Sequence, residues 1–313
     1  MTRVDPHMAE ILKLVAALDL PPFESLSATE ARAVAEERNR FWNEGNPMVA
    51  ELREVALPGP GGTLRLRLYV PAGADAGGPG ILFIHGGGWV ICSLDTHDGV
   101  CRRLANAAQL RVASLDYRLA PEHPFPAPLD DCVAAVRWLA AEGAALGIDP
   151  QRIALAGDSA GANLALATLL ALRDGGHRLP RTAALIYGAY QYEFTGGSYN
   201  AFGGGEYILS APTMRWFRDH YLPDPAQRRN PLAAPLLADL AGLPPLYVAA
   251  AELDPLRDDS DALAGKLARA GVDFDYRLWR GVTHACIMFS RMLPEADRQL
   301  AEIGAFLRRR LSG

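Results

Sequence analysis

Arg152-Ile-Ala-Leu-Ala-Gly-Asp-Ser-Ala-Gly161 is the stretch that decides the fold, because an apolar run ends here in a serine between small residues. More apolar residues follow at 163–170, so the pattern predicts a buried strand that turns sharply into a helix. A Gly-x-Ser-x-Gly pattern at such a junction is typical of a nucleophile elbow, which lifts the serine hydroxyl above the sheet. Ser159 is therefore the candidate nucleophile, and the N–H of Ala160 is a candidate oxyanion donor. The pattern alone is weak in a chain with 30 glycines.

A second glycine-rich segment supports this interpretation. Residues 81–84 predict a buried strand, and His85-Gly86-Gly87-Gly88-Trp89 follows it directly. Glycines let the backbone approach a ligand closely, and a segment of this composition forms the oxyanion hole of lipases and esterases. We expect Gly86 and Gly87 to donate to the oxyanion, His85 to brace the loop, and Trp89 to contact substrate.

An acid and a base follow the serine in the order expected for this architecture. Asp254 comes just after the predicted strand 246–251, and His284 comes after the predicted last strand 274–279. His284 would take the serine proton and later protonate the leaving alcohol, while Asp254 would fix the tautomer of the imidazole. Glu252 and Asp258 are rival acids, although Asp258 equally suits a capping or ion-pairing role at a helix start.

Further apolar runs extend the pattern of alternating strands and helices. Residues 64–70 alternate like an outer strand, whereas 112–115 and 184–187 predict strands buried on both faces. The prediction is an α/β protein of the α/β-hydrolase fold. Its central sheet would have about eight strands flanked by helices and would be mostly parallel, antiparallel only near its start.

Composition narrows the functional classes. A net charge of −5 without a long basic run argues against nucleic acid or an anionic membrane as partner. Four cysteines without CxxC spacing predict free thiols rather than a disulfide framework or a metal site. No apolar run approaches the roughly 18 residues of a membrane span, and charged residues interrupt the N-terminus where a secretory leader would be apolar. We therefore expect a cytoplasmic protein that needs no metal or organic cofactor.

With these motifs, the chain resembles the bacterial hormone-sensitive-lipase-like carboxylesterases, or family IV esterases, of the GDSAG subgroup. The resemblance covers most of the chain: it rests on the HGGGW element, the GDSAG elbow, residues 254–258, and the proline-rich segment 116–127. Within that last segment, Tyr117, Arg118 and Glu122 suit a structural network better than chemistry. Cys92 and the residues after His284 depart from the family pattern, so the shape of the acyl pocket does not carry over.

The resemblance also implies a helical cap over the active site. Its expected parts are an N-terminal segment, residues 1–50, and an insertion, residues 191–225, with the hydrolase core at 51–190 and 226–313. Helical periodicity supports helices near 8–18, 29–42 and 211–221, and glycines at 196–205 suggest a mobile lip. The aromatic and methionine side chains of these segments are the candidates for the substrate pocket, although plain cap core is the simpler interpretation of any one of them: Met8, Phe41, Trp42, Tyr199, Phe202, Met214 and Trp216.

The predicted function is a serine carboxylesterase that acts on small apolar esters with short to medium acyl chains, through an acyl-enzyme. The same groups could pass the acyl group to an alcohol, as an acyltransferase does, or hydrolyse amides or lactones. A non-catalytic receptor is a further alternative, because the plant gibberellin receptors resemble this fold but have lost the histidine that is present here as His284. Family members are often dimers, so a homodimer is expected.

Overall fold

The computed structural model describes residues 3–193 and 195–312, and its centre is one sheet of eight strands. The strands are β1 (Glu51–Gly59), β2 (Gly62–Val70), β3 (Gly78–Ile84), β4 (Arg111–Asp116), β5 (Ile148–Asp158), β6 (Thr182–Ile186), β7 (Leu246–Leu253) and β8 (Phe274–Thr283). Their spatial order is β1-β2-β4-β3-β5-β6-β7-β8. The β1–β2 and β2–β4 pairs are antiparallel and the others parallel, which confirms the predicted sheet. The strand expected at the edge, β2, lies second because β1 covers it.

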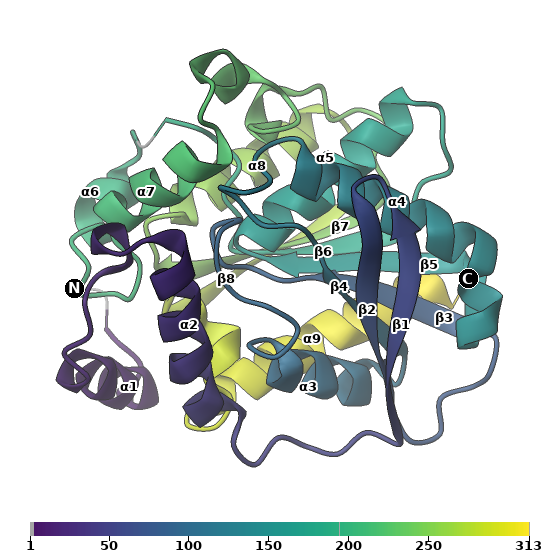
Figure 1. The fold of residues 1–313 in the computed structure, drawn as a ribbon, viewed down its shortest axis with the longest axis horizontal. Coiled ribbons are helices and arrows are strands. Elements are labelled where there is room, and N and C mark those ends of the chain that lie inside the picture. The colour runs from purple at the N-terminus through teal and green to yellow at the C-terminus, as the bar shows by residue number, and fades with distance from the viewer. Residues whose placement is uncertain (1–2, 194, 313) are drawn as a thin grey trace.

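Helices cover both faces of the sheet (Figure 1). On one face lie α3 (Asp98–Ala108) and α9 (Pro294–Leu311), and on the other lie α4 (Ala127–Glu142), α5 (Ala160–Asp174) and α8 (Arg257–Arg269). The side chains of β3 alternate between the two layers: Leu82 and Ile84 pack in one core cluster, and Ile81 and Phe83 in the other. Both faces of the sheet are buried under helices, and the central strands are accordingly apolar along their whole length.

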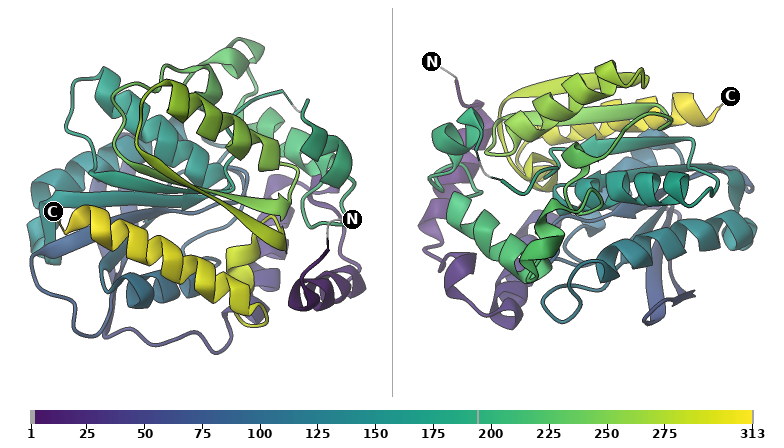
Figure 2. Two further views of the ribbon diagram at one scale, coloured as in Figure 1. Left: turned by 180° about the vertical axis from the view of Figure 1, so that it is seen from behind. Right: turned by 90° about the horizontal axis from the view of Figure 1, so that it is seen from above.

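Four further helices gather at one end of the sheet, around the carboxyl ends of its parallel strands (Figures 1 and 2). They are α1 (Pro6–Ala17), α2 (Ala28–Asn43), α6 (Gly197–Phe202) and α7 (Ala211–Tyr221). Ser27 starts α2 with a capping box that it shares with Glu30. Although α2 and α7 are far apart in sequence, Thr213 of α7 donates to the Glu24 carboxylate just before α2, at 2.5 Å.

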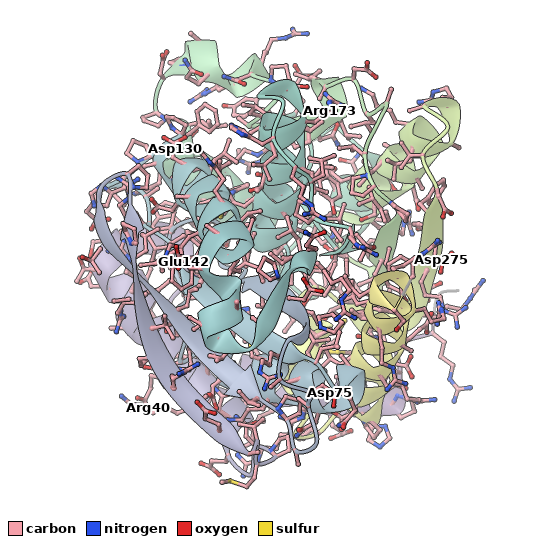
Figure 3. All side chains as sticks on the ribbon, turned by 90° about the vertical axis from the view of Figure 1, so that its right-hand side faces the viewer. Arg40, Asp75, Asp130, Glu142, Arg173 and Asp275 are labelled. Atoms are coloured by element: carbon pink, nitrogen blue, oxygen red, sulfur yellow. The ribbon has the colours of Figure 1, made fainter. Side chains whose placement is uncertain are left out.

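Exposed charged side chains are found at the opposite end of the molecule (Figure 3). Exposed charged side chains such as Asp75, Glu142 and Asp275 lie on the surface seen in Figure 3. Within the described ranges, no helix combines the length and the apolarity that crossing a bilayer requires.

Candidate active site

Ser159 lies at the junction between β5 and α5, in a backbone conformation that L-residues rarely adopt. Its φ of 54° and ψ of −119° place it in a strained turn, which its N–H stabilises by donating to the Ile186 carbonyl at 2.8 Å. The turn leaves no room beside it: a Cβ on Gly161 would lie 1.9 Å from the Ile84 carbonyl oxygen. The elbow therefore needs glycine at this position, and α5 packs directly on the backbone that follows β3.

A continuous hydrogen-bond chain joins the serine to a buried carboxylate. Ser159 Oγ lies 2.8 Å from His284 Nε2, and His284 Nδ1 lies 2.7 Å from Asp254 Oδ2. Asp254 is fully buried, and its other carboxylate oxygen accepts a hydrogen bond from Leu256 N at 2.8 Å. A carboxylate fixed in this way keeps the proton of the imidazole on Nδ1, so that Nε2 is free to accept the serine proton.

The two rival carboxylates have other partners. Glu252 accepts a hydrogen bond from Gly281 N at 2.8 Å and lies 3.9 Å from Arg280. Asp258, in the first turn of α8, accepts from Ser198 N at 2.9 Å and pairs with Arg257. Both therefore stabilise loops around the site, and Asp254 is the one of the three that contacts His284.

The glycine loop differs from expectation at one residue. Gly86 N donates to Asp158 Oδ1 at 2.9 Å, so this N–H points into the protein, and its assignment as an oxyanion donor is wrong. Gly87 and Gly88 line the cavity above Ser159, together with Ala160. Among the described residues, nothing accepts a hydrogen bond from the N–H of these three. Gly88 is thus the candidate donor that the sequence did not single out.

Asp158 anchors this loop from below. Burial alone would raise the pKa of its carboxyl, but His97, 3.2 Å away, and the Gly86 N–H outweigh burial and lower it. Asp158 is therefore an anion that fixes the start of the loop. His97 was not singled out by the sequence, because a lone histidine before a helix carries no spacing signal.

His85 lies behind the loop rather than beside Ser159. Its ring stacks on Tyr117 at 4.3 Å, and the Tyr117 hydroxyl donates to its carbonyl oxygen at 2.9 Å. Burial, reinforced by the nearby His97, lowers the pKa of His85 to about 4. A neutral, buried ring of this kind supports the loop without reaching the nucleophile.

A cavity of about 170 Å³ opens above Ser159 and His284. Of the predicted pocket residues, Trp42, Trp89 and Met214 line it. Cys92 also lines it; burial raises the pKa of its thiol to about 12, so the side chain is a neutral, weakly polar part of the surface. The sequence missed several other apolar residues of this lining: Phe23, Ile91, Ile208, Leu209, Phe217, Met288 and Phe289.

The other predicted pocket residues are absent from the part of the lining that the structure describes. Met8 is buried in the core cluster next to β8, with its sulfur 3.5 Å from Thr283 Oγ1, and Tyr199 is buried in the opposite core cluster. Phe202 packs on Tyr207, and Trp216 on His220. Phe41, also expected there, lies under the Arg291 guanidinium. Met8 and Tyr199 thus pack in the core, Phe202 and Trp216 are half-buried, and Phe41 is exposed.

The chemistry available here is nucleophilic. Across the described residues, no cluster of His, Cys, Asp and Glu is arranged to hold a metal ion. A serine hydroxyl hydrogen-bonded to a histidine, with free N–H groups beside it, suits attack on a carbonyl carbon and stabilisation of the oxyanion that forms.

Comparisons with known proteins agree with this geometry. A family model described as alpha/beta hydrolase fold matches residues 81–288. The ethyl acetate hydrolase of Pseudomonas putida is 36% identical over 98% of this chain and 99% of its own. The carboxylic ester hydrolase LipN of Mycobacterium tuberculosis is 37% identical over 86% of this chain and 73% of its own. Among solved structures, the hyperthermophilic esterase of the archaeon Pyrobaculum calidifontis has a TM-score of 0.94 and 36% identity, with 98% of each chain covered.

The chain therefore belongs to the α/β-hydrolase fold family. Within that family it is a carboxylic ester hydrolase, of the hormone-sensitive-lipase-like kind that its sequence resembles.

Proposed function

We propose that the protein is a serine carboxylesterase that hydrolyses short- to medium-chain esters through an acyl-enzyme. The observation that carries this proposal is the hydrogen-bond chain from Asp254 through His284 to Ser159, which ends at the apolar cavity. A hydroxyl at the base of such a cavity meets an ester carbonyl whose carbon chains are buried against the surrounding side chains.

The chemistry follows from these positions. Ser159 Oγ gives its proton to His284 Nε2 and attacks the carbonyl carbon, while the N–H groups of Gly87, Gly88 and Ala160 donate to the oxyanion. The imidazolium then protonates the leaving alcohol, and the acyl group stays on Ser159. A water molecule, deprotonated by His284, attacks the acyl carbon; the bond between this carbon and Ser159 Oγ then breaks, His284 returns the proton to Oγ, and the acid leaves. Asp254 orients the imidazole and stabilises its positive charge throughout.

The size of the cavity supports small substrates. Its 170 Å³ is below the roughly 300–1,000 Å³ typical of pockets for drug-sized ligands. The relative named ethyl acetate hydrolase points the same way. We therefore assign the highest turnover to esters with acyl chains of a few carbons.

Helices α1, α2, α6 and α7 form the proposed cap, within the predicted segments 1–50 and 191–225. Two observations support it: α2 and α7 both contribute cavity residues, and the Glu24–Thr213 hydrogen bond connects α7 to the turn just before α2. Mobility of the glycine-rich residues 196–205 stays a hypothesis, since part of this stretch forms the helix α6. The cytoplasmic location and the homodimer also stay predictions; analytical ultracentrifugation tests the second.

A p-nitrophenyl ester series from acetate to palmitate tests the proposal, with the wild type and Ser159→Ala compared and an alcohol added as a competing acceptor. We expect turnover to peak at short chains and kcat to fall by about 10³-fold or more in the variant. Ester formation with the added alcohol would favour the acyltransferase alternative. A folded wild type that binds apolar ligands but turns over no ester would contradict the proposal and favour an amidase, a lactonase or a receptor.

A further inference from the structure

One cation lies in the wall of the catalytic cavity. Arg38, on α2, lines the same cavity as Ser159 and His284, and its guanidinium lies 4.9 Å from the centre of the Phe23 ring. Its Nε is buried and has no hydrogen-bond partner in the described part of the chain. Arg38 thus carries a permanent positive charge beside a mostly apolar substrate site.

Among the described residues, no carboxylate pairs with this charge. On a helix, an acid that pairs with Arg38 would stand three or four residues away, and those positions hold Val34, Ala35, Phe41 and Trp42. No described acidic side chain lies within 4 Å of the guanidinium to form an ion pair.

The other two arginines near Arg38 on the same helix are paired. Arg32 contacts Glu122 at 2.5 Å, and Arg40 contacts Glu37 at 2.5 Å. The lining does contain one carboxylate, Asp158, but it is occupied by Gly86 N and His97. Arg38 therefore differs from these two arginines because it lines the cavity and because no described carboxylate pairs with it.

Burial of this kind is unfavourable for a cation. Desolvation lowers the pKa of the Arg38 guanidinium, because the partly buried site favours the neutral form more than water does. Contact with the Phe23 ring offsets part of this cost. A ligand carboxylate in the cavity would offset more, because it would supply both the missing charge and an acceptor for the Nε–H group.

We propose that the enzyme prefers esters that carry a second, free carboxylate away from the scissile bond, and that Arg38 binds this carboxylate. The inference rests on the proposed esterase function and narrows its substrate class to the half-esters of dicarboxylic acids and the acyl esters of hydroxy acids. The reaction at Ser159 is unchanged: water cleaves the ester into an acid and an alcohol, and the second carboxylate takes no part in bond formation.

The overall field of the protein cannot produce this preference. With a net charge of −5, the molecule as a whole repels an anionic substrate. A preference for the anion would therefore have to come from a local group, and Arg38 is the one lysine or arginine among the cavity residues that the structure describes.

Pairs of esters that differ only in charge test the proposal. On the acyl side the pair is monoethyl glutarate and the ethyl ester of glutaramic acid; on the alcohol side it is 4-acetoxybutanoate and 4-acetoxybutanamide. In each pair a carboxylate replaces a carboxamide of the same shape. The measured quantity is the ratio of kcat/KM for the anion to that for the amide, in the wild type, Arg38→Met, Arg38→Lys and Arg40→Met.

We expect the wild type to favour the anion in at least one pair, and that pair tells on which side of the ester Arg38 acts. In Arg38→Met the ratio should fall about tenfold or more, mainly through a higher KM for the anion, since the contact is made equally in the ground and transition states. Arg38→Lys should keep most of the preference. Arg40→Met, which removes a paired arginine from the outer side of the same helix, should leave the ratio as in the wild type.

An unchanged ratio in Arg38→Met, or an equal fall in Arg40→Met, would overturn the inference: Arg38 would then only cover Phe23 with its alkyl stem. If Arg38→Met does not fold, inhibition of the wild type decides, because free glutarate should inhibit turnover of the amide ester at least tenfold more strongly than glutaramide. Equal inhibition by both would also refute the inference. If the enzyme turns over the neutral esters and shows no preference for the anions, this inference alone is refuted. If it turns over no ester at all, the proposed function is refuted as well.

Discussion

The floor and the wall of the cavity are stabilised by different forces. The floor consists of Ser159, Asp254, His284 and the loop 86–88, and backbone turns at the ends of neighbouring strands fix the positions of these residues. The wall consists of side chains on α2, α7 and the loops beside them, which come from distant parts of the sequence and meet through side-chain packing. The comparison teaches that the reaction and the choice of substrate can be altered separately.

The largest effect should follow from a substitution at the floor of the cavity. Asp254→Asn places an amide opposite His284 Nδ1, which favours the wrong tautomer of the imidazole, and we expect kcat to fall by about 10⁴-fold. Steady-state kinetics with p-nitrophenyl acetate measures the loss. Glu252→Gln is the matched control, since Glu252 contacts Gly281 N and not His284, and it should stay within about tenfold of the wild type. Near-normal activity of a folded Asp254→Asn would give the acid role to another carboxylate.

A smaller effect should come from His85, which supports the glycine loop at the floor of the cavity but takes no part in the reaction. Because His85 has its pKa lowered to about 4, the unfolded chain binds a proton at this residue near pH 6.5, while the folded protein does not. The stability that this neutral ring contributes is present above pH 6.5 and is lost as the pH falls toward 4, by up to about 3 kcal/mol.

In His85→Asn this part of the pH dependence should disappear. The amide keeps a donor for the Gly86 carbonyl, which His85 Nδ1 contacts at 2.7 Å, but it does not titrate. Urea unfolding at several pH values between 4 and 7.5 measures the slope of the free energy of unfolding in both proteins. Parallel slopes would show that protonation of His85 does not contribute to the acid sensitivity of the fold.

The smallest effect should come from the wall. Met214→Ala enlarges the cavity, so longer acyl chains should gain about fourfold in kcat/KM for each extra methylene buried, at about 0.8 kcal/mol each. The same ester series measures the shift relative to acetate. Trp216→Ala, two positions along α7 and outside the described lining, should not change the chain-length preference. An equal shift of the chain-length preference in both variants would show that this preference does not depend on the individual side chains that line the cavity.

The sequence predicted the floor of the cavity far better than its wall, for physical reasons. A strand end, a glycine turn and a following helix are local patterns, so Ser159, Asp254 and His284 could be chosen from the order of residues alone. Gly86 was misassigned because three consecutive glycines look alike, and the orientation of the first depends on Asp158, seventy-two positions away.

Helical periodicity found Trp42 and Met214 but failed for other wall candidates, because it marks an apolar face without showing what covers that face. Met8 and Trp216 stand on such faces, but Met8 packs beside β8 and Trp216 packs on its own helix. For Arg38, by contrast, the sequence held a signal that was missed: no acid stands three or four positions away from this arginine on its helix. The expected domain boundaries remain predictions.

The absence of space around Gly161 has a consequence for how such enzymes diversify. Since even a methyl group there would collide with the Ile84 carbonyl, the nucleophile turn and the backbone leading into the glycine loop behave as one inseparable block. We therefore expect substitutions to be tolerated more readily at cavity-lining positions outside this block, such as 38, 42 and 214. A mutant library confined to α2 and α7 should therefore yield new specificities at high frequency, whereas one aimed at 157–161 should yield mostly inactive or insoluble chains.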